Sequence, residues 1–235
     1  MARFLLATVL ILEYGLWVVG HPCNGTNLQG CAATLEANFH CDGTNGDSTG
    51  FPKEVCYIEK CTKAIKSHIK NEFEAAFSYM HMGAYFAQDT VARPGMAKFM
   101  LESASEERSH AILMLDYLNK RGVPISQDLN FAFNESSIAG EYKKESITLL
   151  LALEAALTME MTVTNQIHHV VKECEHDYHG ADVFTNPILD EQHEGIRKLQ
   201  GAIQEYKNLL HGHDQPEGRA MVDFIFDQKL LKESL

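Results

Sequence analysis

Four long stretches of apolar residues at helical spacing constrain this chain more than any other feature of its sequence. In each stretch the apolar side chains recur at steps of three and four, which puts them on one face of an α-helix. The pattern predicts helices over residues 62–89, 94–121, 144–174 and 182–210, with a short fifth helix over 217–226. Pro94 suits a first helical turn, and Gly122 with Pro124 beyond it ends the second stretch.

The lengths of the connections decide how these helices are arranged. Only a few residues join the first helix to the second and the third to the fourth, so each pair must be antiparallel. The connection 123–143 is much longer, and at about 3.3 Å per residue it can run the full length of a bundle. The sequence therefore predicts an all-α fold: a four-helix bundle with one long crossover and a short fifth helix.

Five polar side chains interrupt the apolar faces of these helices. They are Glu72, Glu107, His110, Glu160 and Gln192. Counted from the turn that joins each pair, all four helices bring a polar residue to a similar height, and Glu107 and His110 share one face because they are three residues apart. Three carboxylates in a core cost several kcal/mol each unless they are paired, and no Lys or Arg falls on the inner faces near this level.

A pair of metal ions would neutralise such a cluster directly. Oxygen ligands with one imidazole suit iron or manganese, and zinc is a competitor because it also accepts His and carboxylate. A single Glu on an apparent apolar face is most often a boundary residue in water, and a lone Glu-x-x-His is mostly chance. Polar residues at one level of four helices indicate a metal centre instead.

Charge and the N-terminus bear on partners and compartment. The net charge of −12 argues against a nucleic-acid binder, which needs a basic face, and suits a protein that attracts cations. Arg3 followed by the apolar run 4–12 predicts a secretory signal over residues 1–20. A membrane anchor is the rival interpretation, but Glu13 interrupts the run, so we expect a secreted protein without a membrane partner.

The cysteines agree with an oxidising compartment. Five of the six lie between Cys23 and Cys61, and Cys174 stands alone. The close C-x-x-C pairs of a cytosolic zinc site are absent, so we expect disulfides, for which fifteen pairings are possible. Residues 21–60 then form an irregular cysteine-rich extension ahead of a helical domain over 61–235, and the five N-terminal cysteines are expected outside the helical core. Asn24 and Asn134 open glycosylation sequons.

Five segments are nearly free of gaps against a known family: NEFEAAFSYMHMGAYF, ASEERSHA, ALEAALTMEM, LDEQHEGI and FIFDQKLL. From about Ala64 to Leu230 the sequence resembles the ferritin family in its iron-oxidising heavy-chain form. The leader, the cysteine-rich N-terminus and the stretch AYFAQDTVARPG resemble secreted insect-type subunits in particular. The resemblance implies a ferritin-like fold, a di-iron (Fe2+/Fe3+) centre, oxidation of Fe2+ by O2, and storage as a ferric oxide mineral in a 24-subunit shell.

The resemblance also implies roles for individual residues. Glu72, Glu107 and His110 match the ligands of a first iron, with Glu107 bridging, and Glu160 matches the main ligand of the second. Gln192 matches the glutamine that positions dioxygen or water, and Tyr79 matches a tyrosine that forms a hydrogen bond beside the centre and can supply an electron. Insect-type light chains lose this set, and this sequence keeps it.

Some positions depart from the family pattern on the inner surface. Glu106 keeps one mineral-nucleating carboxylate, but Ser109 and Ile112 replace others. Pro187 falls early in the fourth helix, where it should kink the backbone or delay the helical start.

The resemblance places Asp182 in an acidic ring of the threefold entry channel, where Thr185 replaces a second Glu. The plain alternative for Asp182 is a helix N-cap. Secreted insect-type ferritins pair heavy with light subunits, so the shell is a homo- or hetero-oligomer, and Cys56, Cys61 and Cys174 are candidates for holding it together.

Two other functions stay open at this point. One is a storage subunit without activity, like a light chain, which the intact ligand set opposes. The other is a secreted four-helix signalling protein, but such bundles prefer two long crossovers and have no reason to bury three Glu.

Overall fold

The computed structural model describes residues 39–40, 57–123, 125, 147–175, 177–213 and 215–233. Two short strands, β1 (Phe39–His40) and β2 (Tyr57–Ile58), pair antiparallel ahead of the first helix. The long helices are α2 (Glu59–Ala87), α3 (Pro94–Lys120), α5 (Leu149–Glu173) and α7 (Leu189–Leu210), with α6 (Tyr178–Val183), the π-helical segment η1 (Phe184–Ile188) and α8 (Pro216–Lys232) beside them. The predicted all-α fold is confirmed, whereas the predicted signal, both sequons and most of the crossover lie outside the described residues.

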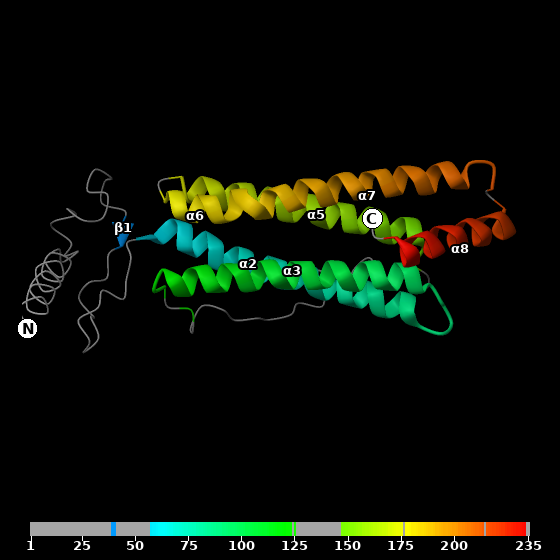
Figure 1. Cartoon of the computed structure of the whole chain (residues 1–235), viewed down its shortest axis with the longest axis horizontal. Coiled ribbons are helices and arrows are strands. Elements are labelled where there is room, and N and C mark those ends of the chain that lie inside the picture. Colours follow the sequence, from blue (N-terminus) through cyan, green and yellow to red (C-terminus); the bar gives the residue numbers. More distant parts are fainter. Residues whose placement is uncertain are drawn as a thin grey trace, which may run out of the picture.

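The four long helices form two antiparallel pairs, α2 with α3 and α5 with α7, and α8 packs against α3 near one end (Figure 1). At that end the Tyr85 hydroxyl accepts a hydrogen bond of 3.1 Å from the Ile147 backbone N–H, just before α5. At the other end Arg121, just after α3, donates two bonds of 2.8 Å to Asp177, just after α5. The end of α3 and the start of α5 therefore lie at opposite ends of the bundle, as one long crossover requires. Among the described residues, no helix combines the length and apolarity needed to span a membrane.

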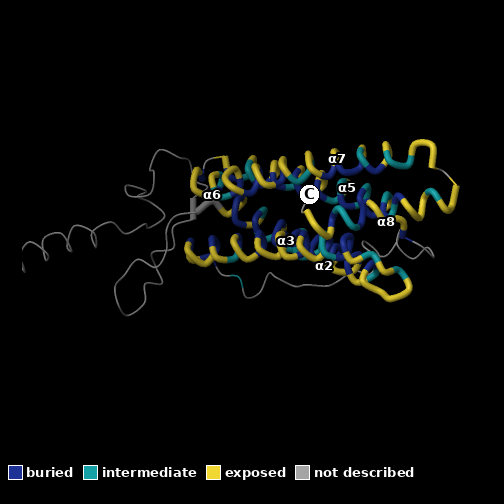
Figure 2. The backbone as a smooth tube through the Cα atoms, turned by 45° about the vertical axis from the view of Figure 1, so that its right-hand side comes forward, coloured by how far each residue is buried: buried dark blue, intermediate teal, exposed yellow. Residues whose placement is uncertain are grey.

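The apolar core is divided into two clusters along the bundle, and the buried side of every long helix faces inward (Figure 2). One cluster contains Phe86, Met96, Leu153 and Tyr206, and the other contains Ile65, Met114, Ile167 and Phe184. The predicted inner faces are buried almost throughout, with Ile196 only partly so. On α3, α5 and α7 the polar positions fall between the two clusters, and on α2 Glu72 follows Ile69 of the second cluster. Packing therefore leaves a polar layer midway along the bundle.

Three helix boundaries differ from the predicted ones by more than three residues. The third helix begins at Leu149, because the Thr148 hydroxyl accepts a 3.2 Å hydrogen bond from the Leu151 N–H and caps it there. The fourth helix is broken before Pro187, where Asn186 is extended (φ −148°, ψ 109°) and precedes a cis peptide bond, so the predicted kink is confirmed. The last helix continues to Lys232 and is thus longer than predicted.

The last helix is held by a polar contact that the sequence pattern does not reveal. Asp227 is buried, and its carboxylate accepts a 2.9 Å hydrogen bond from the backbone N–H of Met96 at the start of α3. It therefore serves as an N-cap supplied from another helix, favoured by the helix dipole as well. A Cβ at Gly95 would lie 1.8 Å from the Asp227 carbonyl oxygen, so glycine is needed for this approach.

A disulfide closes the opposite end of the bundle. Cys61 in α2 and Cys174 after α5 are joined across 113 residues of sequence. The prediction that all five N-terminal cysteines lie outside the helical core is wrong for Cys61. Since α2 begins at Glu59, the Cys61 side chain sits in its first turn and is fully buried. Cys56 lies outside the described residues.

Candidate metal centre

Three predicted ligands meet in the polar layer. Glu72 comes from α2, and Glu107 and His110 come from neighbouring turns of α3. One ligand atom from each lies within 4.8 Å of the other two, and the residues are 0%, 3% and 8% exposed. The His110 Nδ1 is 3.5 Å from an oxygen of Glu107 and 3.9 Å from an oxygen of Glu72. Two carboxylates and an imidazole thus converge on a space that one cation can fill.

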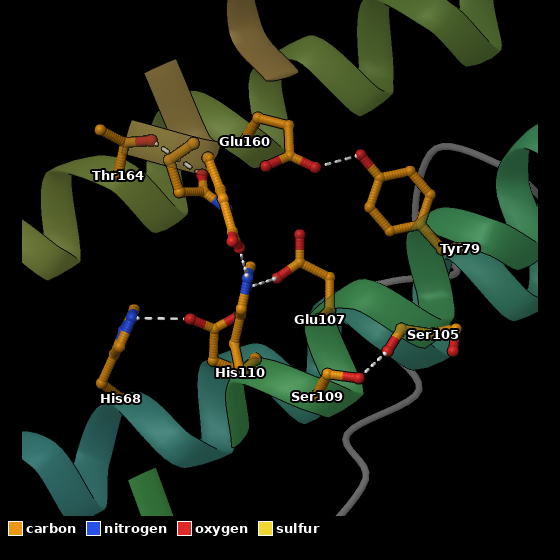
Figure 3. A network of polar contacts seen from close by, with 11 residues as sticks. His68, Tyr79, Ser105, Glu107, Ser109, His110, Glu160 and Thr164 are labelled. Atoms are coloured by element: carbon orange, nitrogen blue, oxygen red, sulfur yellow. Dashed lines mark hydrogen bonds and ion pairs between the residues drawn. The ribbon is translucent and has the colours of Figure 1, made fainter. Parts of the chain in front are cut away.

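Glu160 on α5 faces Glu107 across the core, and Tyr79 on α2 lies beside them (Figure 3). The Tyr79 hydroxyl donates a hydrogen bond to Glu160 on α5, and both side chains are buried. The amide oxygen of Gln192 on α7 accepts a 2.9 Å hydrogen bond from the Thr164 hydroxyl. A cavity of about 380 Å³ is lined by Tyr79, Glu107, His110, Glu160 and Gln192, together with Glu106 and Glu191. The structure therefore brings all six predicted centre residues together, and Glu72, which does not line the cavity, is fully buried beside Glu107 and His110.

Burial makes negative charge unfavourable in this layer. It raises the pKa of Glu107 and of Glu160 to about 8 each, and it raises the pKa of Glu72 as well. For His110, burial lowers the pKa, but the nearby carboxylates of Glu107 and Glu72 outweigh it and bring the pKa to about 9. Besides His110, the basic side chain among the described residues that line the cavity is that of Lys198, which is exposed. Charge compensation therefore has to come from bound protons or bound cations.

Unsatisfied polar atoms give an independent sign of a ligand. Among the described residues, the buried side-chain nitrogen and oxygen atoms without a hydrogen-bond partner belong to His68, Glu72, Glu107, His110 and Gln166. Four of these five residues lie in the polar layer, although buried polar groups normally find a partner. Lone pairs that point into a shared space without a donor suit metal coordination, and the oxygen-rich set with one or two imidazoles suits iron, manganese or zinc.

Sequence reasoning missed three residues of this site. His68 lies one helical turn before Glu72, with its Nε2 2.9 Å from Glu72 Oε1. Glu191 holds the outer nitrogen of His110 at 3.0 Å although its own side chain is 58% exposed. Thr164 orients Gln192. The sequence could have predicted His68 and Thr164, because each is four residues from a predicted ligand on the same helix. Glu191 adjoins Gln192, but it does not fall on the helical spacing of the inner face.

The remaining predicted positions lie outside the centre. Asp182 is exposed within α6 and does not line the cavity. The N-cap alternative for Asp182 is wrong, because α6 is capped by Asp177, whose carboxylate accepts from the Gly180 N–H at 3.1 Å. Ser109 donates to the Ser105 carbonyl at 2.8 Å, and Ile112 is 44% exposed. Neither side chain supplies the carboxylate that the resemblance expects at its position.

A helical bundle whose four long helices converge on a core layer of carboxylates and imidazole belongs to the ferritin-like class of architectures. Residues 62–209 match the family model described as the ferritin-like domain, and the chain belongs to the ferritin family.

Individual relatives agree. The chain is 35% identical to the ferritin heavy chain of Trichoplusia ni over 193 residues, which are 80% of this chain and 87% of that one. It is 32% identical to the ferritin heavy chain of Drosophila melanogaster, over 73% of this chain and 82% of that one. Among solved structures it is similar to the secreted ferritin of Trichoplusia ni, with a TM-score of 0.68 and 34% identity over 82% of this chain and 99% of that one.

Proposed function

We propose that the chain is a ferroxidase subunit of a secreted iron-storage shell, which oxidises Fe2+ with O2 and retains the iron as a ferric oxide mineral. Family membership supports the iron-storage role. The observation that carries the ferroxidase role is the convergence of Glu72, Glu107 and His110 within 4.8 Å, with Glu160 and Gln192 on the same cavity.

The two iron ions are substrates, and the residues of the chain bind them and hold them close together. Glu107 lies between Glu160 on one side and the pair Glu72 and His110 on the other. In this position its carboxylate can bind both cations. Two Fe2+ bring four positive charges to three carboxylates, so the protons that burial retains on Glu107 and Glu160 leave as iron binds. Each Fe2+ then gives one electron to the same O2 molecule, which needs both ions within reach of it.

Neighbouring side chains orient the ligands. The Tyr79 hydroxyl fixes one oxygen of Glu160, which leaves the other for metal. Thr164 binds the amide oxygen of Gln192, so the amide N–H groups remain available to bound oxygen or water. Labile oxygen ligands suit turnover, because the ferric product has to leave for the mineral.

The assembly and the compartment are part of the proposal. The likeness to a secreted ferritin, the predicted signal over residues 1–20 and the buried Cys61–Cys174 disulfide support export through an oxidising lumen. The shell is proposed to hold 24 subunits, alone or with light-type partners, and Asp182 is proposed to line its iron-entry channel. A net charge of −12 favours Fe2+ uptake.

The alternative is a storage subunit without activity. An inactive subunit would not require ligands that converge on one space. The unsatisfied buried atoms of Glu72, Glu107 and His110 therefore favour the catalytic proposal. The signalling alternative is disfavoured by membership of the ferritin family.

Oxygen consumption on adding Fe2+ to the purified, metal-free assembly tests the proposal. We expect fast uptake that Glu160→Ala slows strongly. The matched control is Glu154→Ala on the same helix, whose carboxylate forms a surface ion pair of 2.7 Å with Lys207, and it should retain the wild-type rate. Uptake no faster than that of iron in buffer would favour the inactive subunit. Equal slowing by both variants would place the chemistry elsewhere.

A further inference from the structure

His68 is a buried imidazole that the proposed iron chemistry does not use. It lies on the inner face of α2, is 1% exposed and does not line the cavity. Its ring borders the apolar cluster that contains Ile65, Ile69 and Phe184, and the Phe184 ring lies 6.0 Å away at a tilt of 55°. A polar ring at this depth costs free energy unless it serves a partner.

Its polar contact is with Glu72. The His68 Nε2 lies 2.9 Å from Glu72 Oε1, and Figure 3 shows the ring aimed from α2 toward that carboxylate. The other oxygen, Oε2, faces the His110 Nδ1 at 3.9 Å. Glu72 is therefore divided between two imidazoles, with one oxygen on His68 and the other on the shared ligand space.

The two groups are at hydrogen-bonding distance, but the ring N–H is not aligned with the oxygen, and no hydrogen bond satisfies either group. Such contacts in empty sites often tighten when the bound species arrives. The terminal torsion of a Glu side chain is soft, with broad rather than sharp minima. Without an anchor, Glu72 would sample orientations that turn Oε2 away from the cation, and this freedom would be lost on binding.

We propose that His68 is a positioning residue for the metal centre, with its Nε2–H holding Oε1 of Glu72 so that Oε2 stays turned toward the first metal position. This inference rests on the proposed function, because it assumes that the cluster binds metal. Partners that orient a metal ligand in this way typically change metal affinity by about 10- to 100-fold when they are removed.

Co2+ binding to the metal-free assembly tests the role without using oxidation. Titration calorimetry gives the affinity, and the visible absorption of Co2+ reports its ligand geometry. His68→Leu removes the donor and keeps an apolar side chain of similar size, and we expect affinity at the first position to fall by about 10- to 100-fold. His68→Gln keeps an N–H donor at a similar reach and should restore most of the affinity. His81→Leu, at an exposed position on the same helix, is the matched control for loss of a histidine.

Three outcomes would overturn the proposal. Equal affinity in wild type and His68→Leu would show that His68 only fills space. Equal losses in the Leu and Gln variants, with a changed Co2+ spectrum, would make the imidazole itself a ligand. Lower thermal stability of both variants with unchanged Co2+ affinity would give a packing role.

If His68→Leu does not assemble, His68→Met supplies a flexible side chain without a strong donor. Failure of the ferroxidase proposal would appear separately, as slow oxygen uptake by a wild-type assembly that still binds Co2+ and responds to these variants.

Discussion

Replacing Glu107 by Gln should change activity and stability in opposite directions. Glu107 is 3% exposed and sits between the proposed metal positions, so its charge is useful only when cations are bound. The variant keeps the size of the side chain and removes the charge. We expect fast iron oxidation to fall by about 100-fold or more, as for other residues that stabilise charge directly at a reaction centre, with the helical fold and the assembly intact.

The stability change follows from the pKa of Glu107, which burial raises from 4.5 to about 8 in the metal-free fold. Since a pKa unit is worth about 1.4 kcal/mol, ionising Glu107 in place costs the fold of the order of 5 kcal/mol per subunit. Between those two pH values the folded chain holds a proton that the unfolded chain has released. Wild-type stability therefore falls as pH rises from about 4.5 to about 8, and Glu107→Gln escapes this loss.

Scanning calorimetry of metal-free wild type and variant at pH 5 and pH 8.5 measures the effect. The melting temperatures should be similar at pH 5, and the variant should melt higher at pH 8.5, with saturating Zn2+ removing its advantage. Asp116→Asn, at an exposed position on the same helix, keeps Glu107, so its melting temperature should change with pH as that of wild type does. A difference that is the same at both pH values, or a variant that is less stable at pH 8.5, would refute the reasoning, as would an unchanged oxidation rate.

Three further predictions concern the centre, the proposed channel and the disulfide. Binding of Zn2+ to the metal-free assembly should release at least one proton per site at pH 7, because the pKa of Glu107 and of Glu160 lies at about 8 and that of His110 at about 9. Affinity should therefore rise from pH 6 to about pH 9 and then level off. Calorimetry in buffers of different ionisation enthalpy checks this, and a binding heat that is independent of the buffer contradicts it. Asp182→Asn should slow iron oxidation at low salt with little change in melting temperature, and the slowing should fade as salt screens the charge. Glu217→Gln, at the opposite end of the bundle (Figure 1), should leave the oxidation rate unchanged. An unaltered low-salt rate in Asp182→Asn would contradict the channel role. Replacing both Cys61 and Cys174 by Ala should lower the free energy of unfolding by up to about 5 kcal/mol, the chain-entropy value for a cross-link spanning 113 residues. Oxygen consumption should stay unchanged, because both cysteines lie at the end of the bundle. Equal denaturation midpoints would show that the disulfide is dispensable.

The sequence by itself determined which residues face the core and at what level. Helical periodicity decides the face of each residue, so the inner positions of the four long helices were predictable, including Glu72, Glu107, His110, Glu160 and Gln192. Short connections determine the direction of each helix pair, so counting from the turns was enough to place these five residues in one layer. Both inferences depend only on local geometry, which the chain carries wherever it folds.

Tertiary structure decided everything that depends on which distant residues become neighbours. The cap that Asp227 supplies to Met96 joins positions 131 residues apart, and the contact of Glu191 with His110 joins positions 81 apart. Cys61 could be paired with Cys174 only once the start of α2 and the end of α5 met at one end of the bundle. The helical spacing places His68 on the buried face. Its proposed positioning role, however, depends on which oxygen of Glu72 it contacts. That orientation is set by side-chain packing and not by the helical period.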